Sequence, residues 1–181
     1  MTTYIALLRG INVSGHKPVP MAELQKLFEK LGFKGAKTFI QSGNVVFKSA
    51  EGDRKETAAK IEAGILKKFG FEVPVIVRTP EELGAALAGN PYAKRKLADG
   101  DRVYITYLGE APSRDAIKAL EKHIDAIDEL TIKNNEVYIL AHKGYGNSKL
   151  SNTFVEKKLG VRCTTRNLET TGKLIELAES L

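Results

Sequence analysis

The order of strand-like and helix-like segments in the first 79 residues is the feature that most restricts the fold of this chain. Short apolar runs rich in β-branched residues predict strands, whereas apolar residues at helical spacing predict helices. In chain order the segments are strand, helix, strand, strand, helix and strand, at residues 4–9, 20–31, 36–41, 44–48, 53–70 and 74–79. This is the βαββαβ order of ferredoxin-like folds, in which the helices cover one face of a four-stranded antiparallel sheet.

Residues that favour turns and helix ends separate these segments. Ser42-Gly43 lies between two β-prone runs, and glycine can adopt the positive φ that a tight hairpin turn needs. Gly70 follows the second helical pattern and predicts its C-terminal end. Thr79 is followed three residues later by Glu82, a capping-box pattern that predicts the start of a further, short helix.

The second half of the chain has the same order of segments. It predicts strands at 103–108, 130–133, 137–141 and 161–165, and helices at 113–127 and near 150–159. A terminal helix over 168–181 has no counterpart in the first half. We therefore predict an α+β protein with two ferredoxin-like βαββαβ subdomains, at 1–79 and 102–181. A connector at 80–101, which contains a helix, joins them. The terminal helix belongs to the second subdomain.

Length and composition are those of a globular protein. The 181 residues are 43% hydrophobic and 28% charged, which suits a chain that folds without disulfides or metals. No run approaches the ~20 apolar residues of a membrane span, and the N-terminus lacks the features of a secretion signal. We therefore predict a cytoplasmic protein with no membrane partner. The net charge of +6 permits anionic partners without requiring them.

No recognisable catalytic or metal-binding pattern occurs in the sequence. The single cysteine, Cys163, has strand-like flanks that predict burial, and the three histidines lie far apart, so zinc-ligand spacing is absent. A G-x-S-x-G nucleophile elbow is also absent, and no pair of carboxylates stands out in a loop. We predict no metal site and no cofactor, and the catalytic residues of any enzyme activity stay unknown.

Two polar segments are expected to meet at one end of the first predicted sheet. Arg9-Gly10-Ile11-Asn12 follows the first strand, and Gln41-Ser42-Gly43-Asn44 joins the second strand to the third. The first and third strands of a βαββαβ unit are neighbours, so these segments share an end with the loop before the first helix. The guanidinium of Arg9 has the geometry to bind a carboxylate or phosphate. The predicted ligand-binding pocket consists of Arg9, Asn12, Lys17, Ser42 and Asn44.

A second group of polar residues is expected in the other half, at the opposite end of its sheet. The loop 142–149 follows one strand, and Thr164-Thr165-Arg166-Asn167 ends the last strand. Both segments lead into helices, where Ser148 or Asn147 can cap one and Asn167 the other. We predict that Lys149, Arg166 and Asn167 form a second contact for an anionic ligand.

Five motifs in the chain together resemble those of one family. They are Leu7-Leu8-Arg9-Gly10-Ile11-Asn12-Val13, Gln41-Ser42-Gly43-Asn44-Val45-Val46-Phe47, Ser148-Lys149-Leu150, Glu156-Lys157-Lys158-Leu159-Gly160 and Thr164-Thr165-Arg166-Asn167. On these motifs the chain is identified as a member of the bacterial domain of unknown function 1697 family. The resemblance spans nearly the whole length and implies ferredoxin-like subdomains with no established reaction, cofactor or substrate. Leu168, where the family commonly has Trp, and Ser14, where it often has Gly, depart from the pattern.

These observations favour a protein that binds a phosphate-bearing ligand, either a nucleotide or a nucleic acid backbone, at the polar loops. One alternative is an enzyme that acts on a small anionic metabolite and uses the same region to orient it. Another is a structural or interaction module whose polar motifs make internal contacts, because Asn, Ser and Gly are common turn residues and Arg9 can pair with Glu23. The sequence leaves the oligomeric state open.

Overall fold

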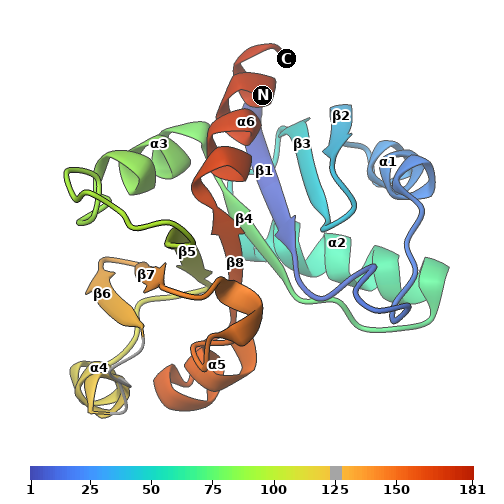
Figure 1. Ribbon diagram of the computed structural model, residues 1–181. Helices are drawn as coiled ribbons and strands as arrows, with labels where there is room; N and C mark the ends of the chain where they lie inside the picture. Colours follow the sequence, from blue (N-terminus) through green and yellow to red (C-terminus); the bar gives the residue numbers. More distant parts are fainter. Residues whose placement is uncertain (123–127) are drawn as a thin grey trace. The chain divides into compact units, whose positions relative to one another are not determined.

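The computed structural model describes residues 1–122 and 128–181 (Figure 1). These residues form two compact units, which we call unit 1 (Met1–Gly84 and Gly172–Leu181) and unit 2 (Ala85–Thr171). The divisions between them fall within two helices, α3 (Pro80–Ala88) and α6 (Leu168–Glu179). Unit 1 is therefore discontinuous in sequence.

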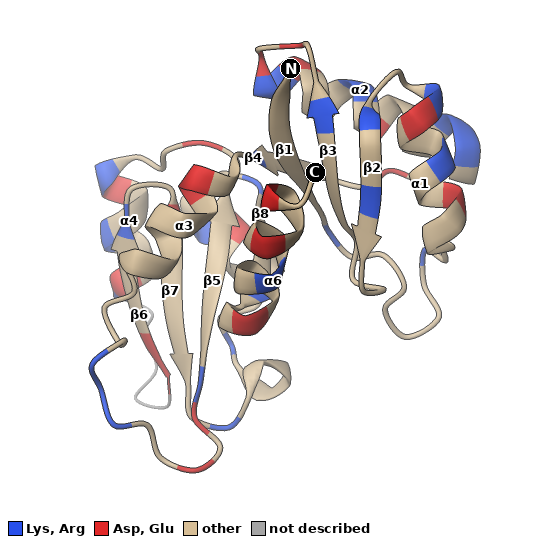
Figure 2. Cartoon of the chain, turned by 90° about the horizontal axis from the view of Figure 1, so that it is seen from above, with Lys and Arg blue, Asp and Glu red and all other residues tan. Residues whose placement is uncertain are grey.

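Unit 1 contains a four-stranded antiparallel sheet in the order β2-β3-β1-β4 (Figure 2). Strand β1 is central, and its register with β3 runs from Thr2 opposite Ser49 to Leu7 opposite Asn44. The order confirms the predicted ferredoxin-like topology. The elements are β1 (Thr2–Leu8), α1 (Met21–Lys30), β2 (Lys34–Phe39), β3 (Asn44–Ser49), α2 (Arg54–Phe69) and β4 (Val75–Arg78).

Helices α1 and α2 pack on one face of this sheet (Figure 1). Alternation along β1 turns Tyr4, Ala6 and Leu8 toward the helices, where they join a buried cluster with residues of both. Helix α2 begins at Asp53, whose carboxylate accepts hydrogen bonds from two backbone N–H groups, and ends at Gly70 with φ 83°. The helix ends are therefore those that the sequence predicted.

The C-terminal residue lies against strands β2 and β3 of unit 1. The ammonium group of Lys48 donates a hydrogen bond to the backbone oxygen of Leu181 over 2.5 Å. Gly35, at φ 61°, lies beside a register shift in β2, and a Cβ there would lie 2.5 Å from a methyl group of Leu181. Leu181, two residues after the end of α6, thus contacts this sheet.

Unit 2 contains a second four-stranded antiparallel sheet, in the order β6-β7-β5-β8. The predicted continuation of its first helix to Ile127 falls on residues 123–127, outside the described residues. Ser151, not Ser148 or Asn147, caps the next helix, and it accepts a hydrogen bond from the Phe154 N–H. The elements are β5 (Arg102–Leu108), α4 (Arg114–Glu121), β6 (Glu129–Lys133), β7 (Glu136–Ala141), α5 (Asn152–Leu159) and β8 (Cys163–Asn167), with a 3₁₀ turn, η1 (Tyr145–Asn147).

Equivalent hydrogen bonds recur in the two units. In unit 1 the carboxylate of Glu62, on α2, accepts from the N–H of Val75 at the start of β4. In unit 2 the carboxylate of Glu156, on α5, accepts from the N–H of Cys163 at the start of β8. Both distances are 2.9 Å. The repeat therefore extends from element order to individual side chains.

A buried arginine occupies the same place in both sheets. Arg78 in β4 lies opposite Ile5, and Arg166 in β8 lies opposite Ile105. In each unit a helix begins within two residues of this arginine: α3 in the first case and α6 in the second. The terminal helix therefore does have a counterpart in the first half, because the segment predicted as a connector begins with the equivalent helix.

Candidate functional site

The segments predicted to form the first ligand pocket lie side by side in unit 1. The N–H of Leu8 donates to the backbone oxygen of Gly43 (2.8 Å), and the N–H of Arg9 donates to that of Pro74 (3.0 Å). Asn44 is opposite Leu7 in the register. The loop after β1 and the turn before β3 therefore meet at one end of the sheet, as the topology predicted.

Asn12 ties these two segments together. Its Oδ1 accepts from the Val19 N–H (2.8 Å), and its Nδ2 donates to the backbone oxygens of Val19 and Gln41, both at 2.9 Å. The residue has φ 54°, a left-handed conformation that Asn tolerates better than most residues. The amide of Asn12 therefore closes the loop over residues 12–19 and attaches it to the hairpin turn.

The remaining residues of this group also make internal contacts. The fully buried Asn44 donates from Nδ2 to the backbone oxygen of Phe39 (3.0 Å) and to Oγ of Ser42 (3.2 Å). The ammonium group of Lys17 donates to the backbone oxygen of Glu72 (2.6 Å). These hydrogen bonds all lie within unit 1, and each stabilises one of its loops.

In unit 2, Arg166 and Lys149 differ in exposure. Arg166 is 8% exposed and donates from Nη1 to Oγ1 of Thr164 and to the backbone oxygen of Thr165, both at 2.9 Å. Its burial lowers the pKa of the guanidinium to about 10. Lys149 is exposed on the loop before α5, so solvent reaches it more readily than it reaches Arg166.

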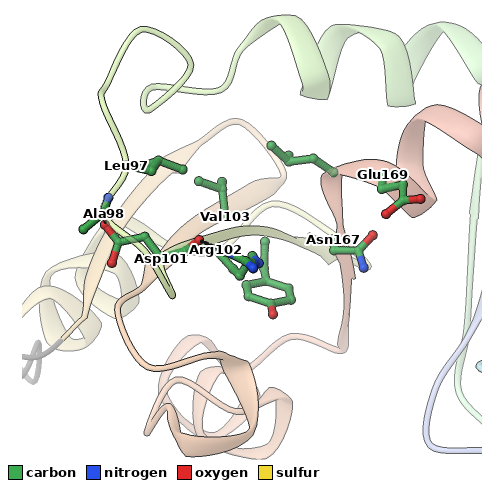
Figure 3. A pocket seen from close by; sticks show the side chains of 9 residues that line it. Leu97, Ala98, Asp101, Arg102, Val103, Asn167 and Glu169 are labelled. Atoms are coloured by element: carbon green, nitrogen blue, oxygen red, sulfur yellow. Dashed lines mark hydrogen bonds between the residues drawn. The ribbon is translucent and has the colours of Figure 1, made fainter.

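A pocket of about 540 Å³ lies in unit 2, at the end of the sheet where β5 begins and β8 ends (Figure 3). Three segments line it: 97–98 before β5, 101–104 at its start, and 167–169 at the junction of β8 and α6. The register places Tyr104 directly opposite Asn167, which brings the last two segments together. The volume falls within the range of about 300–1,000 Å³ that is typical of small-molecule sites.

Asn167 has two structural roles beside this pocket. It is the last residue of β8, and its Oδ1 accepts a 2.7 Å hydrogen bond from the N–H of Thr170 in the first turn of α6. The prediction that Asn167 caps the terminal helix is therefore confirmed. The pocket lies next to that cap and includes Leu168 and Glu169.

The pocket combines charged and apolar side chains. Arg102 is exposed, and its Nη1 donates to the backbone oxygen of Asp101 (2.7 Å). Asp101 and Glu169 contribute carboxylates, and Leu97 and Val103 contribute apolar surface. Figure 3 shows Leu97 on one side of the pocket and Glu169 on the other. The lining can thus bind a ligand that carries both polar groups and an apolar part.

A network of ionisable side chains extends from Asp101 away from the pocket. Asp101 accepts from the N–H of Ala98 (2.9 Å), and its Oδ1 lies 2.8 Å from Nδ1 of His142. Glu129 lies 3.4 Å from Nε2 of His142 and 2.6 Å from Nη1 of Arg95. The hydrogen bond between Asp101 and His142 is the main reason that the pKa of His142 is raised and that the pKa of Asp101 is lowered. Within residues 1–122 and 128–181 no cluster of His, Cys, Asp and Glu is arranged to hold a metal ion.

Comparisons with known proteins place the chain in a family. Residues 1–138 match the family described as "Protein of unknown function (DUF1697)". The chain belongs to the DUF1697 family. No curated protein matches this DUF1697 protein significantly. A solved structure, that of the conserved bacterial protein SP0830 from Streptococcus pneumoniae, is similar to it with a TM-score of 0.74 and 23% sequence identity over 98% of both chains.

The likeness to SP0830 extends over the whole α+β arrangement, and at this identity it establishes the fold alone. The family and fold class predicted from the sequence are both confirmed. Among the described helices of this DUF1697 protein, none combines the length and the apolar character needed to cross a membrane.

Of the residues that line this pocket, only Asn167 was predicted from the sequence as a ligand-binding residue. Leu97 and Asp101 fell in the predicted connector, and Arg102 directly precedes the predicted strand. The available signal was the charged pair Asp101-Arg102 immediately before a buried strand, because charged residues at a strand end lie at an edge of the sheet where ligands can reach them. That signal alone does not identify the opposite wall.

Proposed function

We propose that this DUF1697 protein binds a phosphate-bearing small molecule in the pocket at the start of β5. The proposal rests on one observation: the guanidinium-bearing Arg102 and the amide-bearing Asn167 line the same pocket. A guanidinium donates several hydrogen bonds in a planar array that fits phosphate oxygens. An amide adds a further donor to whichever oxygen it faces.

The pocket favours a small molecule over a nucleic acid backbone. A protein that follows a backbone neutralises successive phosphates with several Lys and Arg side chains. Among the described residues that line this pocket, Arg102 is the only Lys or Arg. A concave site with one cation and an apolar wall is better suited to a compact ligand with one anionic end.

Titration of AMP by isothermal calorimetry at low salt tests the proposal. Replacing Arg102 by Gln removes a charged donor, so we expect the affinity to fall about tenfold or more, from the ~1.5–3 kcal/mol of a charge-assisted hydrogen bond. Arg114→Gln is the matched control, because Arg114 is exposed on α4 of the same unit, does not line the pocket and carries the same charge. Its affinity should stay within about twofold of wild type.

Two results would reject the proposal: no binding of AMP by the wild-type protein at millimolar concentration, or equal losses in the Arg102 and Arg114 variants. The same titration with Arg9→Gln tests the pocket that the sequence predicted in unit 1. A tenfold loss of AMP affinity in the Arg9 variant would indicate that AMP binds at the loops around Asn12 instead.

A further inference from the structure

The charges around the pocket restrict how many phosphate groups a ligand can carry. Within the described chain, the charged side chains that line it are Arg102, Asp101 and Glu169. The carboxylate of Asp101 is paired with His142, 2.8 Å away, which offsets much of its charge while His142 is protonated. Arg102 can therefore neutralise one phosphate group, but a second or third would meet the carboxylate of Glu169.

The hydrogen-bonding capacity of the lining requires donors as well as acceptors on the ligand. A phosphate group at neutral pH presents mainly acceptors, which suit Arg102. The ionised carboxylate of Glu169 only accepts, so its partner must be a hydroxyl or amino group. Asn167 and Glu169 are both exposed, lie two residues apart at the start of α6 and line the same wall (Figure 3). This wall suits the hydroxyl groups of a sugar.

The opposite wall is apolar, and it is open to solvent at Leu97 but not at the buried Val103. Leu97 is one of the large hydrophobic residues that remain exposed, at 39%. It lines the pocket together with Val103. An aromatic base that covers these side chains would remove apolar surface from water, which a bare sugar phosphate would do less well.

We infer that the pocket takes a nucleoside monophosphate and discriminates against inorganic phosphate and nucleoside triphosphates. The phosphate binds Arg102, the ribose hydroxyls donate to Glu169, and the base lies on Leu97 and Val103. This inference rests on the proposed function and narrows its ligand class.

The test compares inorganic phosphate, AMP and ATP by calorimetric titration without divalent cations, so that the triphosphate keeps its full charge. The wild-type protein should bind AMP at least tenfold more tightly than either other probe. Glu169→Gln should weaken AMP binding several-fold, because the amide accepts less strongly, and should strengthen ATP binding, because a repulsive charge is lost. The AMP-to-ATP affinity ratio should therefore fall about tenfold or more.

Glu176→Gln is the matched control, since Glu176 is exposed on the same helix, carries the same charge and does not line the pocket. It should leave the ratio unchanged. Leu97→Ser should weaken AMP binding and leave phosphate binding as it was, which tests the position of the base.

The possible failures can be told apart. If ATP binds the wild-type protein as tightly as AMP, or if Glu169→Gln leaves the ratio unchanged, the restriction to a monophosphate is wrong while phosphate binding stands. If inorganic phosphate binds as tightly as AMP, the base and ribose contacts are wrong. If no probe binds, the proposed function fails together with the inference.

Discussion

Replacing Asn12 by Ala should destabilise the protein strongly, although Asn12 lies in a surface loop. The substitution removes two partly buried hydrogen bonds to Val19 and one exposed hydrogen bond to Gln41. At ~1 kcal/mol for each of the first two and ~0.5 kcal/mol for the third, the loss is about 2.5 kcal/mol. Alanine at the φ of 54° adds about 1 kcal/mol, since a Cβ disfavours the left-handed region and Asn tolerates it.

Asn12→Ala should therefore lower the free energy of unfolding by about 3.5 kcal/mol. Asn12→Gly should lower it by about 1 kcal/mol less, because Gly adopts positive φ without steric cost. Urea unfolding followed by far-ultraviolet circular dichroism measures both. Asn147→Ala is a control with one exposed hydrogen bond, from Nδ2 to the backbone oxygen of Lys143, and should cost about 0.5 kcal/mol. An Asn12→Ala protein within 1 kcal/mol of wild type, or a less stable Asn12→Gly protein, would contradict this reasoning.

Three further predictions concern other parts of the chain. Ile40 is 48% exposed and has φ 50°, a left-handed conformation that a β-branched residue disfavours and Asn tolerates. Ile40→Asn should therefore raise the free energy of unfolding by about 1 kcal/mol in the same urea assay, and a variant less stable than wild type would argue against backbone strain at Ile40. Gly35→Ala should lower the free energy of unfolding by about 1–2 kcal/mol, because alanine disfavours the positive φ of this position and its Cβ would displace the Leu181 side chain. An unchanged free energy of unfolding would contradict this prediction. The hydrogen bond to Asp101 raises the pKa of His142 in the folded protein above its unfolded value of about 6.5. The stability that this pair contributes is therefore fully present below about pH 6.5 and is lost as the pH rises through the folded pKa. The stability difference between wild type and His142→Gln should therefore shrink between pH 6 and 9, and a difference that grows would refute the pairing.

The sequence predicted the order of strands and helices along the chain because local signals determine it, and the βαββαβ order then pointed to the ferredoxin-like sheet. The alternation of apolar residues, the helical spacing that starts after Asp53 and the stop at Gly70 all depend on neighbours within a few positions. The helix after β4 was also predicted from the local capping pair Thr79 and Glu82, which exchange hydrogen bonds in the structure. Its equivalence to α6 was not predicted, although Arg78, Glu81 and Gly84 have the same spacing as Arg166, Glu169 and Gly172.

The sites were harder to predict because side-chain partners are distant in sequence. The residue types of Asn12 and Asn44 suit a ligand site and a loop contact equally well, and only the positions of Val19, Gln41 and Phe39 distinguish these uses. The two walls of the pocket in unit 2 come from segments more than 60 residues apart, at 101–104 and 167–169. No local pattern in either segment indicates that the other lies opposite.

The discontinuity of unit 1 has a consequence for synthesis on the ribosome. The 87 residues of Ala85–Thr171 must be translated between the first part of unit 1 and its last ten residues, Gly172–Leu181. At about 5–20 residues per second this takes about 4–17 s, during which Met1–Gly84 has been synthesised but Gly172–Leu181 has not. The ribosome therefore finishes the synthesis of unit 2 before that of unit 1. During this interval, chaperones and proteases can act on the surface of unit 1 that Gly172–Leu181 later covers.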